Sequence, residues 1–407
     1  MPDDQIFSAA LDLPAAERAV FLQTTCADQA QRNRLEALLA SHEAARSFLE
    51  TPAVDATPHR GAESVLGQTI GPYTLKRVIG EGGGGTVYLA EQSAPVRRLV
   101  AFKIIKLGLD TAGVIQRFEA ERQALAMMDH PDIARVFDAG TTTSGRPYFV
   151  MEFVDGSPIT KFADEHGLDL PARLQLFVRV CAAVQHAHQK GVIHRDLKPS
   201  NILVTHYAGV PTPKVIDFGI AKATAGNLTD ATLLTAVEQF IGTPAYMSPE
   251  QAHQSSVDID TRSDISSLGV LLYELLTGRT PFETAALMRI GLDEIRRHIR
   301  EVDPPRPSTR LITLPADTVT DTASHRHLTP PSLINRLRGD LDWIVMRCLE
   351  KDRARRYDSA TGLAQDLKRH LANEPIEARP ASTVYRLSKL IRRHRVVFGS
   401  ADRKSVV

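Results

Sequence analysis

The spacing of apolar residues divides the chain into a helical beginning, a linker, a strand-rich stretch and a longer helical stretch. In residues 1–49, apolar residues such as Ile6 and Leu11 recur at helical spacing, which predicts a small helical segment. Residues 50–72 contain Thr-Pro pairs and isolated glycines, which are typical of a linker. From Tyr73 onward, short apolar runs predict strands.

Beyond these strands, the apolar spacing predicts helices, one of them buried on nearly every side. Residues 264–278 are apolar almost all round, as in a helix inside a hydrophobic core, and Gly278 ends the pattern. Residues 302–335 carry many Pro, Thr and Asp residues. We therefore interpret them as a long surface insertion.

Composition and charge narrow the classes of function. Hydrophobic residues make up 43% of the chain and charged residues 24%, as in a soluble globular protein, and the net charge of +1 gives no reason to expect a nucleic-acid partner. The three cysteines form no Cys-x-x-Cys pair, which argues against a zinc site or a disulfide framework. The acidic N-terminus lacks the apolar core of a signal peptide, and no uninterrupted apolar run is long enough to span a bilayer.

A glycine-rich segment lies between the first two predicted strands. Its pattern, Gly-x-Gly-x-x-Gly-x-Val, also occurs in dinucleotide-binding folds, but there the glycines open a helix. Here residues 86–90 have the pattern of a second strand, so we predict a hairpin whose backbone amides approach the phosphates of a nucleotide. The candidate residues are Gly80, Glu81, Gly82, Gly83, Gly84, Gly85, Thr86 and Val87.

A lysine and a glutamate from different segments are candidates for an ion pair. Lys103 ends the apolar run 100–103, and Glu121 lies in a helix predicted over about residues 112–128. Glu121 shares the apolar stripe of that helix, and a carboxylate on a buried face needs a partner. We therefore expect Lys103 to pair with Glu121.

The strongest chemical signal lies in residues 192–218 and just beyond. It consists of two predicted loops at the ends of strands. The first loop is His194-Arg195-Asp196-Leu197-Lys198-Pro199-Ser200-Asn201, and the second is Asp217-Phe218-Gly219. Asp196 can accept a proton from an attacking hydroxyl, and Lys198 can neutralise charge on a phosphoryl group. Asn201 and Asp217 offer the oxygen ligands that suit Mg²⁺. Phosphoryl transfer needs this set, because positioning and electrostatics carry its catalysis.

The two loops, in this order, resemble the catalytic and metal-binding loops of bacterial eukaryotic-like serine/threonine protein kinases. The resemblance covers about Tyr73 to Leu371 and implies an α+β, two-lobed fold with ATP and Mg²⁺ bound between the lobes. Residues 73–153 would form a small antiparallel sheet with one key helix, and residues 154–372 a mostly helical lobe. The lysine two residues after Asp196 is typical of serine/threonine kinases, whereas tyrosine kinases carry a different arrangement.

The resemblance also assigns roles around the nucleotide. It implies that Lys103, in a Val-Ala-x-Lys motif, holds the α- and β-phosphates of ATP, and that Val87 covers the adenine. Met151 would be the gatekeeper residue, with adenine bound by the backbone of the next residues. The adenine-side set is then Ala101, Met151, Glu152 and Val154.

Other residues would brace the site. Asp264 would hold the backbone of the catalytic loop, in which His194 would be structural. Residues 242–250 resemble a peptide-substrate platform. In this platform, Thr243 would contact the catalytic aspartate and lysine. Glu250 would pair with an arginine far along the chain, Arg356.

The segment between the metal-binding loop and Glu250 resembles an activation loop. Arg195 would pair with phosphate groups on this segment and order it. We favour Thr232 and Thr235 as autophosphorylation sites, with a homodimer as the arrangement for phosphorylation in trans. The substrates would be serine and threonine hydroxyls of proteins.

Two alternatives remain open at this point. A pseudokinase scaffold would bind partners without catalysis, but its usual signature is the loss of the lysine or of either aspartate, and Lys103, Asp196 and Asp217 are all present. A small-molecule phosphotransferase generally lacks the platform that residues 243–250 provide.

Residues 373–407 form a basic tail with five basic residues between Tyr385 and Arg395, just before the short apolar run 396–398. Such a pattern marks the cytoplasmic flank of a membrane helix, while a basic tail on a soluble protein is the alternative. The last six residues, 402–407, match the translation of a common sequencing-library adapter. We therefore expect a truncated gene, whose full product is a cytoplasmic kinase domain anchored to the inner membrane.

Overall fold

The computed structural model describes residues 6, 21–26, 31–32, 65–82, 85–105, 128–218, 244–252, 259–283, 287, 291–380, 382–383, 385, 387 and 389–390. The chain divides into two compact units, Met1–Val65 and Leu66–Val407. In the first unit, residues 21–25 are helical, and Ile6 and Leu22 are buried. The rest of the description concerns the second unit.

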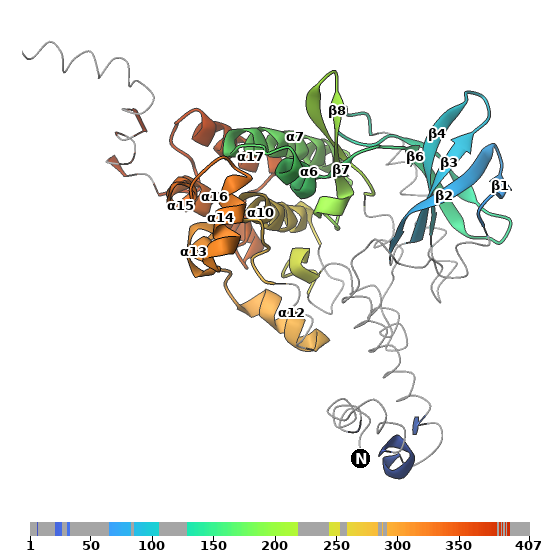
Figure 1. Cartoon of the computed structure of the whole chain (residues 1–407), viewed down its shortest axis with the longest axis horizontal. Helices are drawn as coiled ribbons and strands as arrows, with labels where there is room; N and C mark the ends of the chain where they lie inside the picture. The colour runs from blue at the N-terminus through green and yellow to red at the C-terminus, as the bar shows by residue number, and fades with distance from the viewer. Residues whose placement is uncertain are drawn as a thin grey trace, which may run out of the picture. The chain divides into compact units, whose positions relative to one another are not determined.

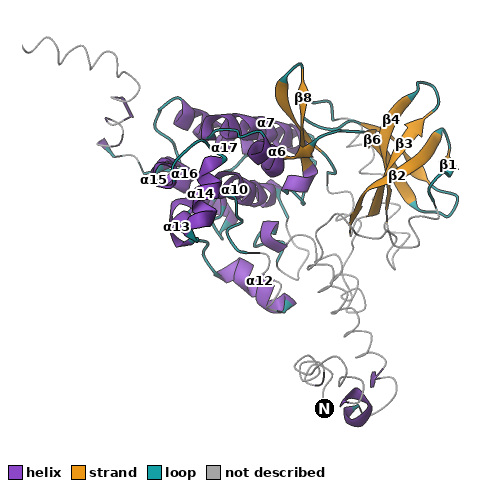
Figure 2. Ribbon diagram, in the orientation of Figure 1, coloured by secondary structure: helices purple, strands orange, loops and turns teal. Residues whose placement is uncertain are grey.

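The second unit begins with a six-stranded sheet, in which every pair of neighbouring strands is antiparallel (Figures 1 and 2). The strand order is β1-β2-β3-β4-β6-β5. The strands are β1 (Thr69–Ile70), β2 (Tyr73–Gly82), β3 (Gly85–Gln92), β4 (Arg98–Ile105), β5 (Val136–Thr141) and β6 (Pro147–Glu152). The end of the expected linker therefore belongs to the sheet, because β1 pairs with β2.

Side-chain alternation along β4 sorts the sheet into two faces. Phe102 points to one face, where its ring stacks on Tyr148 at 4.5 Å and contacts Tyr73 at 5.6 Å. Ala101 and Lys103 point to the other face, and Met151 lies directly opposite Ala101 in the register. The sheet therefore presents a lysine and small or flexible apolar side chains on the same surface.

The helical part is built around α7 and α10, which pack on α17 and α16 respectively. Asp169 caps α7 by accepting a hydrogen bond from the Ala172 N–H at 2.8 Å. Gly278 ends α10 with a left-handed φ of 71°, as predicted. The bounds are α6 (Ile159–Glu165), α7 (Leu170–Gln189), α10 (Thr261–Thr277), α16 (Asp340–Cys348) and α17 (Ala360–Leu371).

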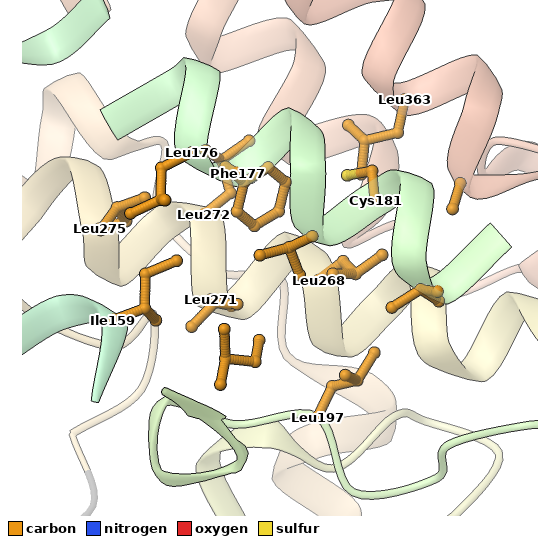
Figure 3. Close-up of a cluster of buried hydrophobic side chains, with 14 of the residues drawn as sticks. Ile159, Leu176, Phe177, Cys181, Leu197, Leu268, Leu271, Leu272, Leu275 and Leu363 are labelled. Carbon is orange, nitrogen blue, oxygen red and sulfur yellow. The ribbon is translucent and has the colours of Figure 1, made fainter. Parts of the chain in front are cut away.

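The interior between these helices is apolar, and it includes one residue of the candidate catalytic loop. Figure 3 shows Phe177 of α7 and Leu271 of α10 in this cluster, with Leu197 pointing into it from the loop below. The cluster extends into the sheet through Ala101 and Met151. One continuous core therefore joins the sheet to the helices.

A small second sheet carries the two candidate loops. Its order is β7 (Ser157–Pro158), β8 (Ile202–Tyr207) and β9 (Val210–Val215). The short helix η1 (Pro199–Asn201) leads directly into β8, and Asp217 follows β9 by two residues. The β8–β9 hairpin thus brings the two loops to the same end of the sheet, since its strands are antiparallel.

The prediction that residues 302–335 form a surface insertion is wrong. They follow α12 (Leu292–Glu301) and form α13 (Pro307–Thr313), α14 (Ala316–Ser324) and most of α15 (Pro330–Leu337). Leu311 and Leu333 are buried in the main core. Pro307 and Pro330 start helices, because a proline at the first helical position loses no hydrogen bond and has a suitable φ.

Within the described ranges, none of the helices has the length and apolarity that a membrane crossing requires.

Candidate active site

The loop that contains His194 and Arg195 is held from below by Asp264 of α10. This fully buried carboxylate accepts hydrogen bonds from the backbone N–H groups of both residues at 2.8 Å, and it lies 2.8 Å from Nε2 of His188. Arg195 has a left-handed φ of 63°, which a non-glycine residue keeps only where its surroundings fix it. Asp264 therefore fixes the shape of the loop.

Asp196, Lys198 and Asn201 meet at the end of this loop. The Lys198 ammonium lies 2.9 Å from Oδ2 of Asp196. The Asn201 side-chain amide donates to the Asp196 carbonyl oxygen at 2.7 Å and to its carboxylate at 3.1 Å. About a quarter of the Asp196 and Lys198 side chains is exposed, so the neighbours that position the carboxylate do not bury it completely.

Lys103 reaches across from the sheet and donates a hydrogen bond to Oδ1 of Asp217. The lysine is buried, and Asp217 has a left-handed φ of 61°. This contact was not predicted from the sequence, where Glu121 was the expected partner. Glu121 lies outside the described residues. Asp217 is therefore a direct partner of the lysine in this structure.

Phe218 anchors the second loop. Its ring is buried and lies 4.7 Å from the His194 ring, while Nε2 of His194 lies 3.1 Å from the Ile216 carbonyl oxygen. Burial lowers the pKa of His194, so the imidazole is neutral at pH 7. A neutral, buried ring suits a structural residue. Gly219 lies outside the described residues.

The glycine-rich hairpin is described on both sides of its tip, whereas Gly83 and Gly84 lie outside the described residues. Gly85 has a φ of 143°, and a Cβ there would lie 2.2 Å from the Ile104 carbonyl oxygen. A Cβ at Gly82 would meet nothing within 4 Å. A residue with a side chain at position 85 would therefore collide with the backbone of β4, so the position needs glycine whether or not it also approaches phosphate. Of the hairpin residues that the sequence predicts to face a nucleotide, the structure describes Gly80, Glu81, Gly82, Gly85, Thr86 and Val87.

The candidate adenine side is formed by β4, β6 and the chain that follows β6. Ala101 and Met151 are buried next to each other on the lysine-bearing face. Glu152 ends β6 and forms an ion pair with Lys214 at 2.9 Å, and Val154 lies in the connection between β6 and β7. Small and flexible apolar side chains suit a flat aromatic base.

Glu250 fastens the candidate peptide platform to α10 and to Arg356. Its carboxylate accepts hydrogen bonds from Nη1 and Nη2 of Arg356 at 2.7 and 2.9 Å, and from the Ser263 hydroxyl at 2.7 Å. Burial favours a higher pKa for Glu250, but these bonds outweigh it and hold the pKa below the ordinary value. The side-chain amide of Gln251 also donates to the Arg195 carbonyl oxygen at 2.8 Å.

The sequence did not predict three of the contacts above: His188 with Asp264, Gln251 with Arg195, and Ser263 with Glu250. No sequence motif or periodicity relates the residues of these pairs. The predicted contact of Thr243 and the candidate phosphorylation sites Thr232 and Thr235 lie outside the described residues.

The donor set fits a Mg²⁺ ion that also binds a nucleotide. Asp217 supplies a carboxylate and Asn201 an amide oxygen, and Mg²⁺ in nucleotide sites takes one or two such ligands together with phosphate and water. Among the described residues, no three His, Cys, Asp or Glu side chains are grouped as metal ligands, so the carboxylate and amide pair would bind the ion together with phosphate and water.

The protein kinase domain family matches residues 73–370 of this chain. The serine/threonine-protein kinase PknB of Mycobacterium tuberculosis is 37% identical over 311 residues, which cover 75% of this chain and 44% of PknB. Pkn1 of Myxococcus xanthus is 34% identical over 312 residues, covering 76% of this chain and 40% of Pkn1. The chain thus spans less than half the length of these curated relatives.

Solved structures share the fold. The crystal structure of the PknI kinase domain of M. tuberculosis superposes with a TM-score of 0.52 at 24% identity, covering 75% of this chain and 98% of that domain. The match supports the two-part architecture of an antiparallel sheet followed by helices.

Proposed function

Because this chain belongs to the protein kinase family, we propose that it is a bacterial serine/threonine protein kinase, which transfers the γ-phosphate of ATP to protein hydroxyls. The observation that carries the proposal is that the group of Asp196, Lys198 and Asn201 lies beside the Lys103–Asp217 pair. The backbone N–H of Ile216, the residue before Asp217, donates to the Asn201 carbonyl oxygen at 2.9 Å and joins the two loops. These groups come from three separate segments, and each suits one task of phosphoryl transfer.

In this proposal, Asp196 orients the substrate hydroxyl and accepts its proton, and Lys198 neutralises charge on the transferred group. Lys103 exchanges its contact with Asp217 for the α- and β-phosphates, with Glu121 as its second partner. Asn201 and Asp217 would hold Mg²⁺, which neutralises phosphate charge when bound. The hairpin amides complete the phosphate contacts.

Regulation would act through the segment that contains Thr232 and Thr235. Phosphate on these threonines would pair with Arg195, whose backbone is already fixed by Asp264. Phosphorylation in trans within a homodimer is the proposed route. The basic residues before residue 396 favour a location at the inner membrane, with the kinase domain in the cytoplasm.

Mass spectrometry after incubation with Mg²⁺ and ATP tests the proposal, with Asp196→Asn as the control. We expect phosphate on Thr232 or Thr235 in the wild type, and transfer reduced by roughly 10²–10⁴-fold in the variant, the range that a general base contributes. Equal phosphorylation of both proteins would contradict the role of Asp196. ATP binding without any transfer would instead indicate a binding scaffold.

A further inference from the structure

A cationic cavity lies in the helical part, in a region that the proposed phosphoryl transfer does not use. It has a volume of about 1070 Å³ and is formed by the end of α15, the starts of α7 and α16, the end of α17 and the segment after α17. Its charged lining consists of Arg336, Arg338, Arg379 and Lys389 against one carboxylate, Asp340. The lining thus carries an excess of three positive charges, with histidine counted as neutral.

Asp340, the one carboxylate of the cavity lining, already has basic partners. Asp340 lies 2.5 Å from the Lys389 ammonium, 3.7 Å from a guanidinium nitrogen of Arg379 and 3.2 Å from Nδ1 of His370. It also accepts a hydrogen bond from the Tyr385 hydroxyl at 3.1 Å. Its charge therefore does not compensate the other cations of the cavity.

Arg336 and Arg338 are exposed at the rim, and neither forms an ion pair with a carboxylate of the described residues. Two uncompensated guanidinium groups that line one cavity favour an anion, and arginine binds phosphate oxygens through paired N–H donors.

The segment that closes the cavity has two unlike faces. Its described residues between 383 and 390 are helical. Tyr385 and Lys389, four residues apart, are each 5% exposed, whereas Leu387 and Leu390 are 56% and 48% exposed. One face therefore holds the segment to the lobe, and the other presents leucines to the surroundings.

We propose that this cavity binds the phosphate of an anionic phospholipid headgroup, while Leu387 and Leu390 contact the acyl boundary of the bilayer. The volume, slightly above the roughly 300–1,000 Å³ of small-molecule sites, leaves room for a headgroup. Apolar side chains beside a basic site favour a lipid over a soluble phosphate. The inference goes beyond phosphoryl transfer and rests on the proposed membrane location.

Vesicle co-sedimentation of the full chain tests this site. The probes are phosphatidylcholine vesicles with and without phosphatidylglycerol. The cavity variant is Arg336→Gln/Arg338→Gln. The control of equal charge is Arg77→Gln/Arg146→Gln, which changes one exposed arginine of β2 and one of the turn before β6. The basic residues beyond 390 are the same in all three proteins. We expect binding to anionic vesicles only, about tenfold or more weaker in the cavity variant and unchanged in the control.

Equal weakening in both double variants would overturn the proposal, because it would indicate general charge attraction. Absence of vesicle binding by the wild type would overturn it too. Binding of inorganic phosphate that depends on Arg336 and Arg338, without vesicle binding, would replace the lipid by a soluble phosphate. Phosphotransfer is measured in parallel and is expected to be unchanged. Its loss in the wild type would concern the proposed kinase function and not this site.

Discussion

Among the described glycines of the glycine-rich hairpin, Gly85 tolerates substitution least. Its φ of 143° and the 2.2 Å that would separate a Cβ from the Ile104 carbonyl oxygen make the position strained for any other residue. From the sequence, we expected this glycine to be needed for the approach of the backbone to phosphate. The structure gives a second reason, which is packing. The packing reason depends on the distance between β3 and β4, which the sequence does not contain.

We expect Gly85→Ala to lower the free energy of unfolding by about 1–3 kcal/mol, the usual cost of a residue forced into such a conformation. It should also raise the KM for ATP, because the hairpin must shift. Thermal unfolding and ATP kinetics check this, with Gly82→Ala as the matched control. A stability loss of the same size in Gly82→Ala would contradict the assignment.

The contact of Lys103 with Asp217 shows the limit of prediction for single residues, while the predicted pair with Glu121 lies outside the described residues. Helical spacing placed Glu121 on a buried stripe, and this local pattern suggested the pair. The contact with Asp217 joins residues 114 positions apart, and no periodicity relates them. The types and order of the catalytic residues were readable from the sequence, whereas their mutual contacts depend on how the sheet meets the helices.

At the scale of elements, prolines were the main source of error. Pro307 and Pro330 were interpreted as signs of a loop, although each starts a helix. By contrast, the all-apolar pattern of α10 and its final Gly278 were predicted correctly, since burial on every side leaves an unambiguous pattern.

The Glu250–Arg356 pair connects the chain after residue 244 to α10 and to the turn before α17, and it should make stability depend on pH. The folded pKa of Glu250 lies below its ordinary value near 4.5. The pair therefore contributes stability above about pH 4.5, and this contribution is lost as the pH falls through the folded pKa. At pH 7, Glu250→Gln should lower the free energy of unfolding by about 3 kcal/mol, because a buried arginine loses its charged partner. The variant should therefore unfold at a lower urea concentration than the wild type.

Urea unfolding between pH 3 and pH 7 checks this prediction, with Glu294→Gln as the control. Glu294 pairs with Arg297 on the exposed side of α12, where water screens the interaction. A difference between wild type and Glu250→Gln that stays constant over this pH range would be evidence against the predicted linkage.

At the scale of the whole molecule, Asp340 fastens the chain after α17 to the helical lobe. Burial opposes the ionised form of Asp340, but the bonds from His370 and Lys389 prevail and lower its pKa from 3.8 to about 2. The stabilisation is therefore present above about pH 4 and is lost as the pH falls toward 2. We expect Asp340→Asn to cost about 1–2 kcal/mol at pH 7, as a discounted estimate from this shift.

Release of this segment should also expose Tyr385, which is buried in the wild type, and so make the bond after it accessible to chymotrypsin. Limited digestion with chymotrypsin should cut Asp340→Asn faster at this position. The exposed Asp317→Asn substitution on α14 serves as the control. Equal cleavage rates in all three proteins would show that Asp340 does not hold the segment.

The core that runs from Ala101 and Met151 of the sheet to Phe177 and Leu271 of the helices has a consequence for melting. Apolar side chains shared by both parts leave neither part a complete interior of its own, so the two should lose structure together. The fluorescence of Trp343, the single tryptophan, reports on α16, and the hydrogen exchange of β4 amides reports on the sheet. On heating, both signals should change at one temperature, because the sheet and the helices then unfold as a single cooperative unit.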